Sequence, residues 1–269
     1  MKRFSKLFHD LDESTKTNDR IQYLVDYFKE APETDSIWVC WFLGGNRIKG
    51  ALKVSELRKF ASERSGFPEW LIEECHDRVG DLAETISLLI GKGEKEYDGR
   101  LEDVVRYFIQ PMVSMNTAER KERILEAWSL LGKKDLLPFH KLLTGGFRMG
   151  VSKGNLCKAL AKVGNVEPAL ITQRLAGDWT PEHLSLREIL DPSDDEGRLC
   201  KPFPFCLAHP LQEEIECLGQ VQDWQIEWKW DGIRAQLINR GGANMVWSRG
   251  DESVGHSFPE IVEAGKWLP

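Results

Sequence analysis

The sequence lacks the patterns that mark a zinc-stabilised, secreted or membrane protein. Its six cysteines form no C-x-x-C pair and its six histidines form no H-x-x-x-H pair, so a structural zinc site is not expected. No apolar run approaches the length that spans a membrane, and the residues after Met1 contain no signal-peptide core. We therefore expect a cytoplasmic protein with reduced thiols and no membrane contact.

The composition is that of a globular protein with an uneven charge. The 269 residues are 41% hydrophobic and 29% charged, which is typical of a folded chain long enough for two domains. The net charge of −7 alone argues against a nucleic-acid partner. However, residues 111–175 carry 11 Lys and Arg against 5 Asp and Glu. This segment can contact phosphates, although a solvated helical surface would explain the same pattern.

Apolar residues recur at three- and four-residue steps over residues 1–190 and predict a succession of helices. Residues 4–11 and 21–28 are two such segments. Residues 37–43 are apolar on all sides, as in a buried helix or a buried strand. We expect one long helix from Pro68 to Ile90, with Trp70 and Val79 among its core residues. Asn116 and Thr117 open a further helix.

An acidic, turn-rich stretch separates this helical part from the rest of the chain. After residues 191–198 the apolar period changes from helical spacing to alternation. We therefore predict an α+β protein with a helical domain over residues 1–190, a linker over 191–200 and a second domain over 201–269.

The second part contains the most regular alternation in the chain. Residues 224–230 alternate large apolar and polar side chains, which predicts a half-buried β-strand with Glu227, Lys229 and Asp231 in a row. Asp231 and Gly232 form a turn signal. Residues 234–239 and 244–249 are expected to pair as a hairpin that returns Arg249 toward Lys229.

A lysine at this position can act as a nucleophile only after it loses its proton. The ordinary pKa of ~10.4 means that holding the amine neutral at pH 7 costs roughly 4 to 5 kcal/mol. Desolvation, metal ions or nearby cations can supply this, whereas the neighbouring Glu227 and Asp231 oppose it. The carboxylates therefore need another role, such as orienting the lysine or contacting a base or ribose. An amphipathic strand with a solvated lysine is the alternative.

These residues resemble a known motif. Glu227-x-Lys229-x-Asp231-Gly232-x-Arg234 is similar to the nucleotidyl-transfer motif of ATP-dependent DNA ligases, RNA ligases and mRNA-capping enzymes. Residues 204–210 and 248–252 resemble the DNA-ligase segments before and after it. The resemblance implies that Lys229 is the catalytic nucleophile, that Glu227 contacts adenine and that Asp231 and Gly232 shape the turn. It also implies nucleotide or nick contacts by Arg234 and Arg249.

A second chemical signal lies in the glycine-rich stretch over residues 142–156. Ser152 can cap the helix that follows, which would place free amides and a positive dipole end beside Arg148 and Lys153, as suits a phosphate. An ordinary glycine-rich helix connection is equally consistent with the residues. The stretch resembles the loop and helix of the all-helical DNA-binding domain of ATP-dependent ligases. Arg148, Gly150, Ser152 and Lys153 are then implied as DNA-backbone contacts.

Taken together, the chain resembles bacterial ATP-dependent DNA ligases of the B type, with further matches at residues 15–18, 44–47 and 80–85. The resemblance implies a monomer that seals nicks in double-stranded DNA through a lysyl-AMP intermediate, with ATP and Mg²⁺, in replication, repair or recombination. It also implies that residues 201–269 begin an antiparallel, β-rich adenylation domain of ATP-grasp-like type, in which the chain is truncated. The alternatives are a non-catalytic fragment that binds nicked or duplex DNA, and an RNA ligase or guanylyltransferase.

Overall fold

A computed structural model of the chain describes residues 1–91, 97–145, 147, 150–175, 179–193, 202–203, 210–211, 214–225, 227–228, 230–240, 242–249 and 252–268. The chain divides into two compact units, Met1–Ser193 and Asp194–Pro269. The described part of the first unit is helical, and that of the second contains a two-stranded antiparallel sheet. The predicted fold class, a helical part followed by the start of an antiparallel β part, is confirmed.

The first unit is built from a series of short and medium-length helices. They are α1 (Lys2–Glu13), α2 (Thr17–Glu30), α3 (Glu33–Leu43), α4 (Val54–Ser65), α5 (Glu69–Val79), α6 (Leu82–Leu89), α7 (Leu101–Val104), the π-helical η1 (Val105–Ile109), the 3-10 helix η2 (Gln110–Val113), α8 (Thr117–Leu130), α9 (Lys133–Thr144), α10 (Lys153–Gly164), α11 (Pro168–Arg174) and α12 (Leu186–Leu190).

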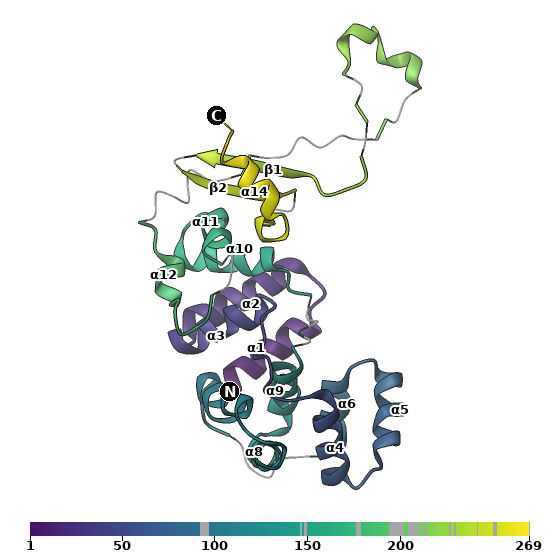
Figure 1. The fold of residues 1–269 in the computed structure, drawn as a ribbon, viewed down its shortest axis with the longest axis vertical. Coiled ribbons are helices and arrows are strands. Elements are labelled where there is room, and N and C mark those ends of the chain that lie inside the picture. Colours follow the sequence, from purple (N-terminus) through teal and green to yellow (C-terminus); the bar gives the residue numbers. More distant parts are fainter. Residues whose placement is uncertain are drawn as a thin grey trace. The chain divides into compact units, whose positions relative to one another are not determined.

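The helices of the first unit form two packed groups. Helix α10 packs along α2 and also contacts α11 and α12, while α6 packs on α9 and α4 contacts α8. Figure 1 shows α10 to α12 beside α2 and α3 at one end of the unit, and α4, α5, α6 and α8 at the other. One continuous core joins both groups. Its largest fully buried side chains include Trp128, Phe4, Phe8, Phe42, Phe60, Phe108 and Phe139.

The periodic apolar faces of the first helices are confirmed. In α1 the buried side chains include Phe4, Leu7, Phe8 and Leu11, and α2 buries the predicted face from Ile21 to Phe28. The ambiguous stretch over residues 37–43 is helical and lies within α3. Most of its side chains are buried because helices pack on it from several sides.

The single long helix expected from Pro68 to Ile90 is wrong. It is divided into α5 and α6 at Gly80, which takes a left-handed conformation with φ +76° and ends α5. Asp81 then caps α6 by accepting a hydrogen bond from the amide of Glu84 at 3.1 Å. Helix α5 packs on α4 and α6 with Ile72 buried, while Trp70 is 68% exposed and Val79 is exposed too, against the prediction that both are core residues.

The second unit is built around a hairpin of β1 (Ala235–Arg240) and β2 (Ala243–Ser248). Its register pairs Ala235 with Ser248 and Arg240 with Ala243, which confirms the predicted pairing to within one residue at each strand end. Gly242 has φ +85°, a backbone conformation that the two-residue turn requires and that favours glycine. The 3-10 helices η3 (Ile215–Leu218), η4 (Val221–Asp223) and η5 (Gly255–Ser257) and helix α14 (Pro259–Gly265) complete the described elements.

The half-buried strand predicted over residues 224–230 is not found in the described residues of that stretch. Trp228 is 86% exposed and Trp230 is 82% exposed. The indole Nε1 of Trp224 donates to the carbonyl oxygen of Leu218 at 2.6 Å, which ties this residue back to η3. An alternating sequence becomes a strand only where another strand pairs with it. In the part of the second unit that is described, β1 and β2 pair with each other, and β2 forms one isolated bridge, between Trp247 and Ser253, but no strand pairs with residues 224–230.

Candidate nucleic-acid interface and nucleotide site

Helix α10 begins at Lys153, directly after the N-cap that the sequence predicts, so the first amides of the helix have no acceptor within the helix backbone. Ser152 is its N-cap and accepts a hydrogen bond through Oγ from the amide of Asn155 at 3.2 Å. Ser152 and Lys153 are both exposed, and the first turn contains no acidic residue. A helix start with free amides and no carboxylate attracts anions, because the helix dipole is positive there.

The glycine-rich segment that leads into α10 is anchored at its start by an aromatic contact. The ring of Phe147 lies among three aromatic side chains of the core, with centroid distances of 6.3 Å to Phe4, 6.4 Å to Phe8 and 6.0 Å to Phe42. These residues belong to α1 and α3. Phe147 is therefore attached to the core through its side chain, while Gly145 and Gly150 on either side of it are exposed.

Arg47 lies against the first glycine of this segment. A Cβ on Gly145 would come within 2.9 Å of Cδ of Arg47, so the aliphatic stem of the arginine lies directly over the glycine backbone. Gly145 also has φ +75°, and it ends α9. Arg47 is exposed. Its charged group is thus carried on a stem that rests on the glycine segment.

Arg20 holds the other end of the segment. Its Nη1 donates to the carbonyl oxygen of Gly150 at 3.3 Å, and its Nε donates to the carbonyl oxygen of Leu11 at 3.2 Å. Gly150 has φ +63°, and a Cβ there would overlap the guanidinium of Arg20. The positive φ favours glycine at this position, and the end of the Arg20 side chain would have to move to admit a Cβ.

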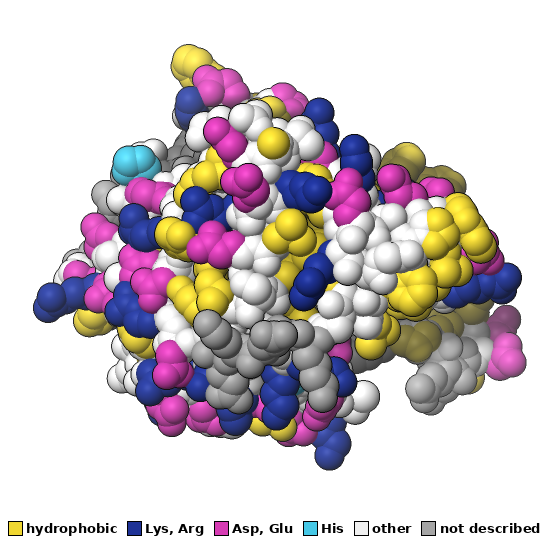
Figure 2. Space-filling view, turned by 90° about the horizontal axis from the view of Figure 1, so that it is seen from below, with side chains coloured by type: hydrophobic (Ala, Val, Ile, Leu, Met, Phe, Trp, Pro, Cys, Tyr) yellow, Lys and Arg dark blue, Asp and Glu magenta, His cyan; other side chains and the backbone are white. Residues whose placement is uncertain are grey.

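The cations at the opposite end of the first unit are arranged differently. Arg58 pairs with Glu73 at 3.1 Å, and Lys121 pairs with Glu63 at 2.6 Å. Figure 2, which looks at this end, shows Lys and Arg interspersed with Asp and Glu. In contrast, among the residues described, neither Arg47 nor Lys153 forms an ion pair with a carboxylate. No described carboxylate therefore neutralises either of these two cations.

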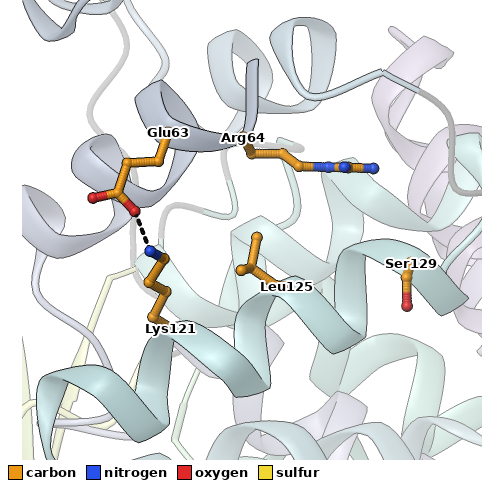
Figure 3. Close-up of a pocket in the computed structure, with 5 residues that line it drawn as sticks. All are labelled: Glu63, Arg64, Lys121, Leu125 and Ser129. Carbon is orange, nitrogen blue, oxygen red and sulfur yellow. Dashed lines mark ion pairs between the residues drawn. The ribbon is translucent and has the colours of Figure 1, made fainter. Parts of the chain in front are cut away.

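A pocket of about 310 Å³ lies between α4 and α8 and shows this neutralisation in detail. It is lined by Glu63, Arg64, Lys121, Leu125 and Ser129. Figure 3 shows Glu63 and Lys121 pointing toward each other, while Arg64 extends in another direction. The ion pair with Lys121 lowers the pKa of Glu63. The carboxylate therefore stays ionised and neutralises Lys121, whereas Arg64 forms no ion pair with a carboxylate among the described residues.

The second unit brings together two of the arginines implied as nucleotide contacts. The amide of Arg249 donates to the carbonyl oxygen of Arg234 at 3.1 Å, which places the two residues opposite each other just beyond the paired strands. Both are exposed. Adjacent positive charges of this kind suit a polyphosphate or a nucleic-acid backbone.

The other implied nucleotide contacts are exposed, and two implied site residues are not placed. Glu227 accepts a hydrogen bond from the side-chain amide of Gln225, and Asp231 and Gly232 lie in a bend. Lys229, the implied nucleophile, and Arg148, an implied DNA contact, lie outside the described residues. Their roles stay predictions.

A comparison with known protein families identifies the family of the helical part of the chain. A family model described as "DNA ligase N terminus" matches residues 1–161, which is more than half of the chain. The chain therefore belongs to the DNA ligase N-terminus family.

Curated relatives extend the likeness to most of the chain. It is 26% identical over 262 residues to a probable DNA ligase of Koribacter versatilis, covering 94% of this chain and 45% of the relative. It is 24% identical over 281 residues to a DNA ligase of Nitrosopumilus maritimus, covering 95% and 47%. A DNA ligase of Thermococcus fumicolans is 25% identical over 278 residues, covering 96% and 49%. The chain spans about half the length of these relatives.

Arg20 and Arg47 were not among the site residues expected from the sequence. Arg47 could have been found, because residues 44–47 resemble bacterial ligases and contain a glycine pair followed by an arginine. For Arg20 the sequence gives no such signal. Its contact with Gly150 joins residues 130 positions apart and depends on the packing of α10 along α2.

Proposed function

We propose that this chain is the DNA-binding and nucleotide-binding front portion of an ATP-dependent DNA ligase. The observation that carries the proposal is the family match over residues 1–161 together with the nucleotidyl-transfer motif at residues 227–234. The helical unit supplies the grip on nicked double-stranded DNA. The second unit supplies the lysine that carries AMP.

The proposed DNA contacts are electrostatic and independent of base sequence. Amides at the start of α10, with Ser152 and Lys153, face outward, and the glycines before them allow close approach of a phosphodiester backbone. Gly150 and Arg148 complete the proposed set. Such contacts fix the position of a duplex without reading its sequence, as a nick-sealing enzyme requires.

In the proposed reaction Lys229 attacks the α-phosphorus of ATP, a P–N bond forms, and the P–O bond to pyrophosphate breaks. The 5′-phosphate at the nick then attacks the phosphorus of the bound AMP, so the P–N bond breaks and a P–O–P bond forms. The 3′-hydroxyl attacks the phosphorus of the 5′-phosphate, AMP leaves, and the strand is sealed. Arg234 and Arg249, held opposite each other, would contact the ribose, the phosphates or the nick, and Glu227 would contact adenine. Asp231 and Gly232 would shape the turn beside Lys229.

Magnesium is the metal that such phosphoryl transfers use. Among the described residues, no group of three His, Cys, Asp or Glu side chains could hold a metal ion.

The remaining parts of the proposal follow from the family. We propose a monomer that acts in the cytoplasm in DNA replication, repair or recombination. Within the described residues, no helix has both the length and the apolar character needed to cross a bilayer.

The test of the proposal is covalent labelling. The protein is incubated with α-labelled ATP and magnesium, and the acid-stable label is mapped in the wild type and in the Lys229→Ala variant. We expect a label on Lys229 that nicked DNA with a 5′-phosphate removes. If the wild type binds duplex DNA but takes no label, the chain is a non-catalytic DNA-binding protein. A label discharged only onto RNA ends would identify an RNA ligase instead.

A further inference from the structure

Arg20 joins three segments of the first unit through its guanidinium group. It lies near the start of α2 and donates to Leu11, in the last turns of α1, and to Gly150, before α10. Both acceptors are backbone carbonyl oxygens rather than carboxylates. The side chain therefore fixes backbone positions without losing its positive charge to these contacts.

The guanidinium of Arg20 lies close against the backbone of Gly150. The φ of +63° favours glycine, and a Cβ there would overlap the guanidinium. Gly150 lies two residues before the N-cap Ser152. A shift of its carbonyl would therefore displace the chain that enters α10, where the exposed Ser152 and Lys153 lie.

We propose that Arg20 is a positioning residue for the DNA interface, which holds Gly150 so that the start of α10 meets the phosphodiester backbone in one orientation. This inference rests on the proposed DNA binding. It assigns Arg20 an indirect role through Gly150, in contrast to a direct phosphate contact.

A double-mutant cycle separates the two roles. We compare the wild type, Arg20→Gln, Gly150→Ala and the double variant for affinity to a nicked duplex over a range of salt concentrations. Each single variant should weaken binding about tenfold, as expected for loss of one charge-assisted hydrogen bond. The double variant should be no weaker than the weaker single variant, because both changes break the same contact.

Two further variants serve as controls. Arg3→Gln removes an equal charge and an equivalent bond, since Nη1 of Arg3 donates to the carbonyl oxygen of Glu30 at 2.7 Å. This bond lies ten residues further along α2, or ~15 Å away, and its loss should change DNA affinity less than about twofold. Arg20→Lys keeps the charge, but one ammonium cannot reproduce the two-armed contact, so we expect only partial recovery of affinity.

Amide hydrogen exchange reports the positioning without DNA. The amide of Asn155, which donates to Ser152, should exchange faster in Arg20→Gln than in the wild type and at the wild-type rate in Arg3→Gln. Unchanged exchange would overturn the proposal, and so would losses of DNA affinity that multiply in the double variant. If the wild type fails to bind duplex DNA while exchange responds as expected, it is the proposed function that fails, and the role at a DNA interface fails with it.

Discussion

Trp128 donates a hydrogen bond from its indole Nε1 to Nε2 of His140 at 2.8 Å, in the core between α8 and α9. Nδ1 of His140 lies 2.8 Å from Oγ of Ser87, which donates to the carbonyl oxygen of Ala83 at 2.6 Å. The histidine must therefore be neutral, with its proton on Nδ1. This chain of bonds links α6, α8 and α9 and leaves no ring nitrogen unpaired.

The first prediction concerns acid stability. Burial lowers the pKa of His140 to about 3, whereas the unfolded chain takes up this proton near pH 6.5. Between these values the unfolded state binds one more proton, so the free energy of unfolding falls by about 1.4 kcal/mol per pH unit as the pH decreases. Denaturant unfolding at pH 7.5 and 4.5 should show a contribution from His140 of about 2 to 3 kcal/mol.

His140→Gln provides the comparison. Its stability at pH 7.5 will be lower, because a buried network is disturbed. Its pH dependence below pH 6.5 should nevertheless be shallower than that of the wild type by about 1.4 kcal/mol per unit. Carboxylates titrate alike in both proteins, so their contributions cancel in the difference between the two slopes. Equal slopes of unfolding free energy against pH for the two proteins would show that His140 is not buried in its neutral form.

The second prediction separates stability from DNA binding at Ser152. Ser152→Ala removes the acceptor for the amide of Asn155 and should cost about 1 kcal/mol of unfolding free energy. Ser152→Asp keeps an N-cap acceptor but adds a negative charge where a phosphate is proposed to bind. It should retain wild-type stability and lose DNA affinity, as measured by thermal unfolding and by titration. Tighter DNA binding by Ser152→Asp would remove the start of α10 from the interface.

The third prediction concerns the ion pair between Lys141 and Asp81, which joins α9 to the start of α6. Burial acts to raise the pKa of Asp81, but hydrogen bonds from Lys141 and the Glu84 amide outweigh this effect and the pKa is lowered. Asp81→Ala removes both the pair and the cap and leaves Lys141 buried, at a cost of about 3 kcal/mol.

Asp81→Asn is the matched variant, because it can still cap α6 but cannot neutralise Lys141. It should be less destabilised than Asp81→Ala in denaturant unfolding. In the wild type the pKa of Asp81 is lowered by folding, so the ionised carboxylate stabilises the fold above the ordinary pKa of aspartate. This contribution to the free energy of unfolding should be lost progressively as the pH falls below about 4. Identical unfolding free energies for the two variants would mean that Asp81 contributes through its charge alone.

The sequence predicted the local features well and the long-range contacts poorly. The apolar periods of α1 and α2 and the Ser152 cap depend on neighbouring residues, and the structure confirms them. Gly80 interrupts a period that continues on both sides of it, so apolar spacing alone predicted one helix where there are two. The tryptophans at 228 and 230 alternate like a strand, but pairing depends on a partner strand that alternation does not specify.

In the candidate site, too, the sequence predicted local features better than long-range contacts. Ser152 and Lys153 lie within a recognisable loop and helix start, whereas Arg20 reaches Gly150 only through the packing of α10 on α2. The register of the hairpin places Arg234 and Arg249 opposite each other, and the glycines at the turn allowed this pairing to be predicted. Lys229 and Arg148 lie outside the described part of the chain, and their roles remain predictions.

The most direct test of the account is the salt dependence of duplex DNA affinity. If the helical unit contacts phosphates, the logarithm of the association constant should fall linearly with the logarithm of salt concentration, with a slope of about −0.9 per phosphate. Lys153→Gln should make this slope shallower by about one. Lys121→Gln, which removes a lysine already paired with Glu63, should leave it unchanged. A wild-type slope indistinguishable from zero would contradict the central claim that this chain grips the DNA backbone.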